Sequence, residues 1–172
     1  MMEPVSLEYD VKPMPEKPWA TTGTKMEREH NIVNSLFLQP DALEKSNLER
    51  FDRYKYIEEN EVMYEEYMMD DAEICIAAFG IAARVAKNAI VEARNKGIKV
   101  GMIRPITLWP FPTKVFEAAA EKAHTFISVE LSMGQMLEDV KLATKCKGEY
   151  MLCSRVGGMI PSPEEVLAAI EK

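Results

Sequence analysis

The pattern of apolar and polar residues divides the chain into three stretches that we expect to fold differently. Residues 1–40 contain five prolines and show no sustained apolar period. Proline fixes its own backbone angle and removes a hydrogen-bond donor, so this stretch predicts an extended lead-in or linker with no core of its own. The lead-in could lie against its own domain or against a partner.

Residues 41–71 predict an acidic amphipathic helical arm. Asp41 with Glu44 three residues later is a variant of the capping box, and apolar side chains then recur at helical spacing as far as Met68. The stripe consists of Leu48, Phe51, Tyr54, Ile57, Tyr64, Tyr67 and Met68. The arm holds eleven acidic and four basic residues, so it accounts for the whole net charge of −7. It could pack on its own domain or on another subunit.

Residues 72–172 alternate short apolar runs with helical periodicity, which is the pattern of strand–helix repeats in a parallel sheet. The expected strands are 73–79, 99–103, 125–129 and 149–153, and the expected helices are 82–96, 113–123, 134–144 and 162–171. Gly97 marks the end of the first helix, and Ser162 with Pro163 and Glu165 marks the start of the last. The predicted fold class is α/β, a doubly wound, mostly parallel sheet of about four strands.

Right-handed crossovers would bring the carboxyl ends of these four strands to one edge of the sheet. Arg104, Glu130 and Arg155 each follow a strand, so we expect the carboxylate to pair with the guanidiniums there. Gly157 and Gly158 would let a backbone approach closely and could attract an anion. The candidate edge or interface residues are Gly80, Arg104, Pro105, Trp109, Glu130, Gln135, Arg155, Gly157 and Gly158.

Several kinds of chemistry lack support in the sequence. His30 and His124 lie away from this edge, and neither GxGxxG after the first strand nor GxxxxGK[ST] occurs. Cys75, Cys146 and Cys153 form no CxxC pair, which suits a reduced, cytoplasmic chain. The acidic balance argues against nucleic acid, and no apolar run is long enough to cross a membrane. We therefore predict no catalytic, cofactor-binding or metal-ligating residue, and expect a binding or assembly domain.

Four stretches together resemble the 2-oxoacid:ferredoxin oxidoreductases, which are thiamine-diphosphate enzymes. The stretches are 78–87, 97–112, 129–136 and 155–165. In order and spacing they are similar to the C-terminal, transketolase C-terminal-like part of the subunit that carries the pyrimidine-binding domain. The lead-in and residues 64–67 are most similar to the 2-ketoisovalerate type.

The resemblance implies a role in the oxidative decarboxylation of a 2-oxoacid to an acyl-CoA with reduction of ferredoxin, and the 2-oxoacid that it favours is 2-ketoisovalerate. It implies a complex that uses thiamine diphosphate, Mg, iron–sulfur clusters and coenzyme A, with none of them bound by this chain alone. The implied partners are the other subunits, ferredoxin indirectly, and a second copy in a possible dimer. No pyrimidine-binding domain precedes residue 41, so we expect a C-terminal part that is inactive alone. The alternatives are 2-oxoglutarate or pyruvate as the substrate, or a free-standing α/β interaction module without an enzymatic role.

Overall fold

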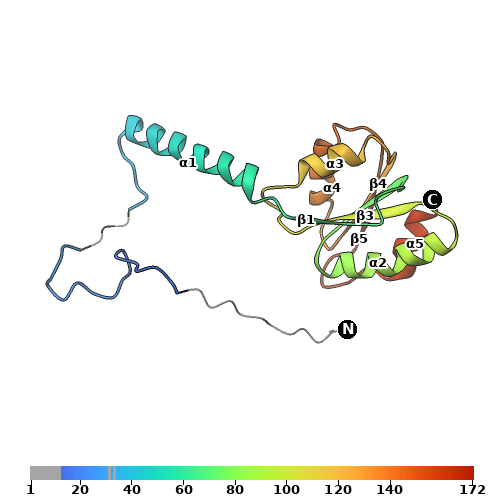
Figure 1. Ribbon diagram of the computed structural model, residues 1–172, viewed down its shortest axis with the longest axis horizontal. Coiled ribbons are helices and arrows are strands. Elements are labelled where there is room, and N and C mark those ends of the chain that lie inside the picture. The colour runs from blue at the N-terminus through green and yellow to red at the C-terminus, as the bar shows by residue number, and fades with distance from the viewer. Residues whose placement is uncertain (1–12, 31, 33) are drawn as a thin grey trace. The chain divides into compact units, whose positions relative to one another are not determined.

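The computed structural model describes residues 13–30, 32 and 34–172 (Figure 1). The chain divides into two compact units with the boundary between Lys45 and Ser46. In the first unit, the described residues before Pro40 form no helix or strand, as expected for the lead-in. Residues 1–12 of the predicted lead-in lie outside the described residues.

Helix α1 (Pro40–Asn60) is shorter than the helix that the apolar stripe predicts. It begins at Pro40, so Asp41 lies in its first turn instead of capping it. At the other end, the side-chain amide of Asn60 donates to the carbonyl of Tyr56 at 2.8 Å. The prediction of helix through Met68 was wrong, because the chain leaves the helix at residue 61 and continues as a strand.

That strand is β1 (Tyr64–Tyr67), which pairs antiparallel with β3 (Val100–Pro105) and makes the sheet five-stranded. Glu65 lies opposite Arg104 in this pairing. The spacing of Tyr64 and Tyr67 fits a helical stripe, but the strand is selected by a partner far away in the sequence. The predicted boundary at residue 71 therefore falls inside the sheet domain.

The other strands confirm the α/β class. Strands β2 (Ile74–Ala78), β4 (Thr125–Glu130) and β5 (Glu149–Ser154) run parallel to β3, and the order across the sheet is β1-β3-β2-β4-β5. All four parallel strands lie within two residues of their predicted bounds.

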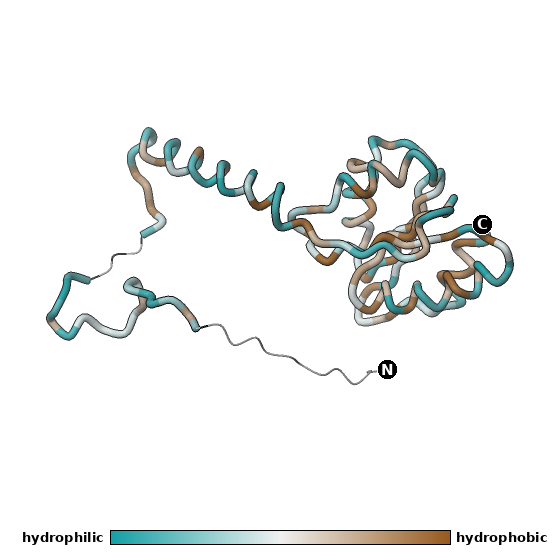
Figure 2. Tube along the Cα trace, in the orientation of Figure 1, coloured by the Kyte–Doolittle hydropathy of each residue, from teal (hydrophilic) through white to brown (hydrophobic). Residues whose placement is uncertain are grey.

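Helices cover both faces of this sheet (Figure 1). α2 (Gly80–Asn95) and α5 (Pro163–Ile170) share one core with Ile76 and Ala78 of β2. α3 (Thr113–Ala119) and α4 (Gln135–Ala143) share the other with Cys75 and Ala77. Alternate residues of β2 thus point to opposite faces, as the pleat of a strand requires. Hydrophobic residues gather in this domain, whereas α1 is mostly hydrophilic (Figure 2).

Two predicted helix ends are confirmed. Beyond α2, Gly97 adopts a left-handed φ of 84°, and the Ile98 N–H donates to the Ala93 carbonyl at 3.1 Å, which closes a Schellman motif. At the start of α5, Ser162 and Glu165 form a reciprocal capping box with Pro163 in the first turn. Within the described part of the chain, we find no helix of the length and apolarity that a bilayer crossing requires.

Candidate functional site

The loops that follow β2, β3, β4 and β5 lie at the carboxyl edge of the sheet, as the crossovers predict. Gly80 is the first residue of α2, Gln135 is the first residue of α4, and Pro105 ends β3 opposite Tyr64. Besides Trp109, eight large apolar side chains in the loops after β3, β4 and β5 or in the first turn of α2 are 43% to 72% exposed. They are Ile81, Ile106, Leu108, Leu131, Met133, Val156, Met159 and Ile160. We call these eight residues the apolar rim.

The predicted cluster of Arg104, Glu130 and Arg155 is wrong. The Arg104 guanidinium lies 2.9 Å from the carboxylate of Glu65 on β1, and Arg155 pairs with Glu165 of α5. Strand β2 separates β3 from β4, so the ends of those two strands are about 10 Å apart at ordinary strand spacing. Arg155 is nearer, since its backbone N–H donates to the Glu130 carbonyl at 3.2 Å, but its side chain pairs within its own loop and helix.

Glu130 is instead a buried hydrogen-bond acceptor, with only 1% of its surface exposed. The hydroxyls of Ser128 and Ser132 donate to its carboxylate at 2.7 and 2.5 Å. The backbone N–H groups of Met136 and Leu137, in the first turn of α4, donate at 3.4 and 3.3 Å. A carboxylate is favoured at a helix amino terminus, so Glu130 joins the end of β4 to α4 and shapes the loop between them.

Glu65 is the acid that the sequence analysis overlooked at this edge. Its carboxylate accepts from the Lys87 ammonium at 2.6 Å and from Arg104 at 2.9 Å. The hydrogen bond from Lys87, followed by that from Arg104, lowers the pKa of Glu65 below the ordinary glutamate value. No signal within residues 64–67 could have found it, because the strand is selected by its pairing with β3. These contacts tie the edge strand β1 to α2 and β3.

We expect Arg104→Ala to lower the free energy of unfolding by about 0.5–1 kcal/mol at pH 7, because the pair is partly exposed. The lowered pKa of Glu65 means that the stabilisation is present above the unfolded-state pKa and is lost as the pH falls through the folded-state value. Urea unfolding at pH 7 and at about pH 3 should therefore show a smaller deficit at the lower pH. Lys147→Ala, which removes a more exposed pair with Glu121, is the matched control and should change little. An equal deficit at both pH values would contradict the pairing.

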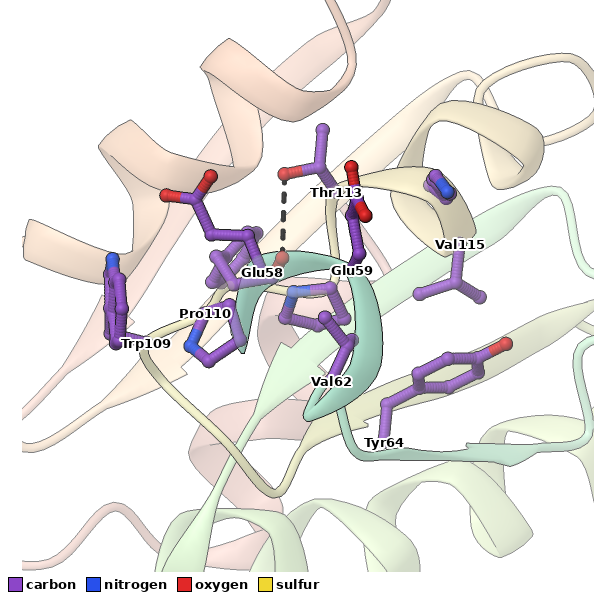
Figure 3. A pocket seen from close by; sticks show the side chains of 11 residues that line it. Glu58, Glu59, Val62, Tyr64, Trp109, Pro110, Thr113 and Val115 are labelled. Atoms are coloured by element: carbon purple, nitrogen blue, oxygen red, sulfur yellow. Dashed lines mark hydrogen bonds between the residues drawn. The ribbon is translucent and has the colours of Figure 1, made fainter. Parts of the chain in front are cut away.

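A second feature is a hollow of 540 Å³ between the end of α1, the start of β1 and the loop into α3 (Figure 3). Trp109 and Pro110 lie on one side of it, and Tyr64 and Val115 lie on another (Figure 3). The full lining is Glu58, Glu59, Val62, Tyr64, Trp109, Pro110, Phe111, Pro112, Thr113, Lys114 and Val115. The sequence analysis singled out Trp109 but missed the contribution of α1, because it extended that helix through the turn that forms the hollow.

Hydrogen bonds hold the loop beside this hollow in place. The Thr107 hydroxyl donates to the Pro110 carbonyl at 2.9 Å and accepts from the Met63 N–H at 3.0 Å. Phe111 stacks on the buried ring of Phe116 with the ring centroids 5.2 Å apart. The loop beside the hollow is therefore held at Thr107 by hydrogen bonds and at Phe111 by ring stacking.

Side chains that could bind a metal ion do not cluster in the described part of the chain. No group of three or more His, Cys, Asp or Glu side chains that could hold a metal ion occurs among them. Burial raises the pKa of Cys75 to about 12, and Cys146 is exposed on the surface. Gly157 and Gly158 both have left-handed φ angles, and a Cβ atom added at either would meet nothing within 4 Å. Their loop is therefore open, with no contact that defines an anion site.

Comparison with solved structures places this fold among the α/β domains of the transketolase type. A 2-oxoglutarate:ferredoxin oxidoreductase from Magnetococcus marinus aligns with a TM-score of 0.64 and 18% identity, over 78% of this chain and 24% of that one. A split-gene transketolase aligns with a TM-score of 0.53 and 14% identity, over 63% of this chain and 40% of that one.

Sequence comparison then identifies the family. Residues 72–166 match the pyruvate:ferredoxin oxidoreductase core domain II, and the chain belongs to that family. The ketoisovalerate oxidoreductase subunit VorB of Methanothermobacter marburgensis is 46% identical over 173 aligned residues, which cover 100% of this chain and 49% of that protein. The chain thus spans about half the length of the curated relatives it matches.

Proposed function

We propose that this chain is the assembly domain of a 2-oxoacid:ferredoxin oxidoreductase subunit that acts on 2-ketoisovalerate. The observation that carries the proposal is the 46% identity to a ketoisovalerate oxidoreductase subunit along the whole chain. In the proposed complex, a 2-oxoacid is oxidatively decarboxylated to an acyl-CoA and ferredoxin is reduced. The chain alone is inactive, and the proposal includes a cytoplasmic location, for which the cysteine content is the support.

The apolar rim supports a role in assembly. Its side chains come from three loops and the first turn of α2 at a single edge of the sheet, and the nearby charges of Arg104 and Arg155 are paired within the chain. An exposed apolar surface rimmed by satisfied polar groups is typical of a protein–protein interface. We propose that the candidate residues Gly80, Arg104, Pro105, Trp109, Glu130, Gln135, Arg155, Gly157 and Gly158 shape or flank this interface and do not touch substrate.

The proposed complex would hold its thiamine diphosphate, Mg, iron–sulfur clusters and coenzyme A outside this domain. Among the described residues, no group of His, Cys, Asp or Glu side chains could hold a metal ion, and the proposal assigns no chemical step to a side chain of this chain. Its contribution to catalysis is then positional, through contact with the other subunits and, indirectly, with ferredoxin.

A domain exchange tests this proposal. Residues 62–172 of this chain, which include β1 and the whole of α5, would replace the matching part of the Methanothermobacter marburgensis subunit in its complete complex. We expect the hybrid to retain methyl viologen reduction that depends on 2-ketoisovalerate and coenzyme A. An assembled hybrid without such activity would contradict the enzymatic assignment and favour a free-standing interaction module.

The same hybrid tests the apolar rim. Met133→Lys places a charge on the rim, whereas Leu142→Lys places the same charge on α4, at a residue of almost equal exposure, 75% against 72%. We expect Met133→Lys to reduce co-purification of the partner subunits at least about tenfold, because burying an unpaired charge in an interface costs several kcal/mol. Leu142→Lys should leave it unchanged. Equal recovery of partners with both variants would exclude the rim as an interface.

A further inference from the structure

Helix α1 leaves most of its apolar stripe uncovered. No residue of α1 is buried, and Leu48 and Phe51 are 64% and 61% exposed. The sequence of an isolated helix contributes little to its stability, because most helical stability in proteins comes from packing an apolar face against other elements. We expected the stripe to pack on its own domain or on another subunit. In the described residues, the contact with the sheet domain is made by the carboxyl-terminal part of α1, from Tyr54 onward.

The contact at that end is aromatic. Tyr54 meets the edge of Trp109 with the ring centroids 5.4 Å apart, and Phe51 lies 5.8 Å from Tyr54. Trp109 remains 54% exposed, so its ring is available from the hollow. A second hollow, of 520 Å³, shares Trp109 and Glu58 with the first. Together the two hollows form one aromatic groove, which we call the α1–Trp109 groove.

The charges around this groove are poorly matched within the chain. Glu58 and Glu59 line it, and Glu61 follows directly, all at the carboxyl end of α1, whose last turn has no basic residue. The carboxyl end of a helix already carries partial negative charge. Three carboxylates placed there are therefore repelled by the helix end and by one another. Among the described residues, Glu58 and Glu59 make no ion pair; the bases on the groove are Lys55, which pairs with Asp52 at 3.9 Å, and Lys114.

We propose that the α1–Trp109 groove binds an arginine-bearing segment of a partner polypeptide. A guanidinium stacks on the face of tryptophan and pairs with carboxylates through its N–H groups, so it matches both the ring and the two acids. The alkyl stem of the arginine would cover Val62 and Pro110, which line the same hollow. The proposal is independent of the oxidoreductase assignment, since it rests on the groove alone.

Trp109 itself provides the measurement. The chain has two tryptophans, and the other, Trp19, is 66% exposed in the lead-in, so Trp19→Phe leaves Trp109 as the sole tryptophan reporter. The full-length Trp19→Phe chain would be titrated with acetylated, amidated hexa-arginine at low salt. We expect a saturable change in Trp109 fluorescence that weakens as salt is added. Hexa-lysine should bind at least about threefold more weakly, because it lacks the planar group that stacks.

Paired variants decide whether the groove is the site. Glu58→Gln with Glu59→Gln should weaken hexa-arginine binding about five- to tenfold, as expected for two partly exposed pairs. Glu49→Gln with Glu138→Gln removes the same charge at residues that line neither hollow and should change binding less than about twofold. Equal effects of the two pairs, equal binding of hexa-lysine, or no change at Trp109 would overturn the proposal. Concentration-dependent dimers that change Trp109 fluorescence without peptide would do so too, by making a second copy the occupant.

Discussion

Replacing Glu130 with alanine should lower the free energy of unfolding by about 3–5 kcal/mol, because several buried donors lose their shared acceptor at once. The hydroxyls of Ser128 and Ser132 and two backbone N–H groups of α4 all converge on this carboxylate. Alanine would leave all four donors without this acceptor, three of them buried, and would open a cavity between β4 and α4. Urea unfolding followed by far-ultraviolet circular dichroism measures the loss.

Two further variants separate the causes. Glu130→Gln keeps the shape but replaces one oxygen by an amide that donates, so we expect an intermediate loss of about 1–2 kcal/mol. Glu149→Ala removes an exposed acid at the start of the neighbouring strand and should change stability by less than about 0.5 kcal/mol. A loss below about 1 kcal/mol for Glu130→Ala would show that the buried bonds contribute little.

Gly101→Ala should also destabilise the chain strongly, by about 2–3 kcal/mol, through overpacking. A Cβ atom at this position of β3 would lie 2.4 Å from the carbonyl oxygen of Met68 and 2.7 Å from the Met69 sulfur. The methionine side chain can move, but the carbonyl is held by a hydrogen bond from the Arg94 guanidinium at 2.6 Å. The backbone after β1 must therefore shift. Thermal and urea unfolding at pH 7 measure the effect.

Gly157→Ala is the control for that substitution. Gly157 has a left-handed φ of 65°, but an added Cβ would meet nothing within 4 Å, so only backbone strain is added. We expect a loss of about 1 kcal/mol, smaller than at Gly101. If the two substitutions cost the same, the close approach of residues 68 and 69 to β3 does not restrict position 101.

The sequence predicted the parallel part of the sheet well, because each of those strands is a local apolar run beside a local helical period. It did not predict β1, since nothing within residues 64–67 distinguishes a strand from a helical continuation. What makes this segment a strand is its pairing with β3, and what makes Glu65 acceptable there is the approach of Lys87 and Arg104. Both causes lie far away in the sequence.

In the candidate site, too, the local features were predicted and the contacts between distant residues were not. Residues 104, 130 and 155 were correctly placed at strand ends, but their pairing was wrong because a shared sheet edge does not make strand ends neighbours, and Glu65 and Glu165 pair with the two arginines instead. Strand β2 occupies the centre of the sheet and separates β3 from β4. The hollow at Trp109 was missed for another reason: its second wall is the end of α1, and the predicted helix had no end there.

The central place of β2 also determines the order in which the sheet can be completed during synthesis. On a growing chain, β1 emerges first but has no neighbour, because its partner β3 is made only after β2 and α2. The arrival of β3 supplies both the antiparallel ladder to β1 and the parallel ladder to β2. A three-stranded half-sheet can therefore close on the ribosome before β4 and β5 exist, with the exposed side of β2 waiting for β4.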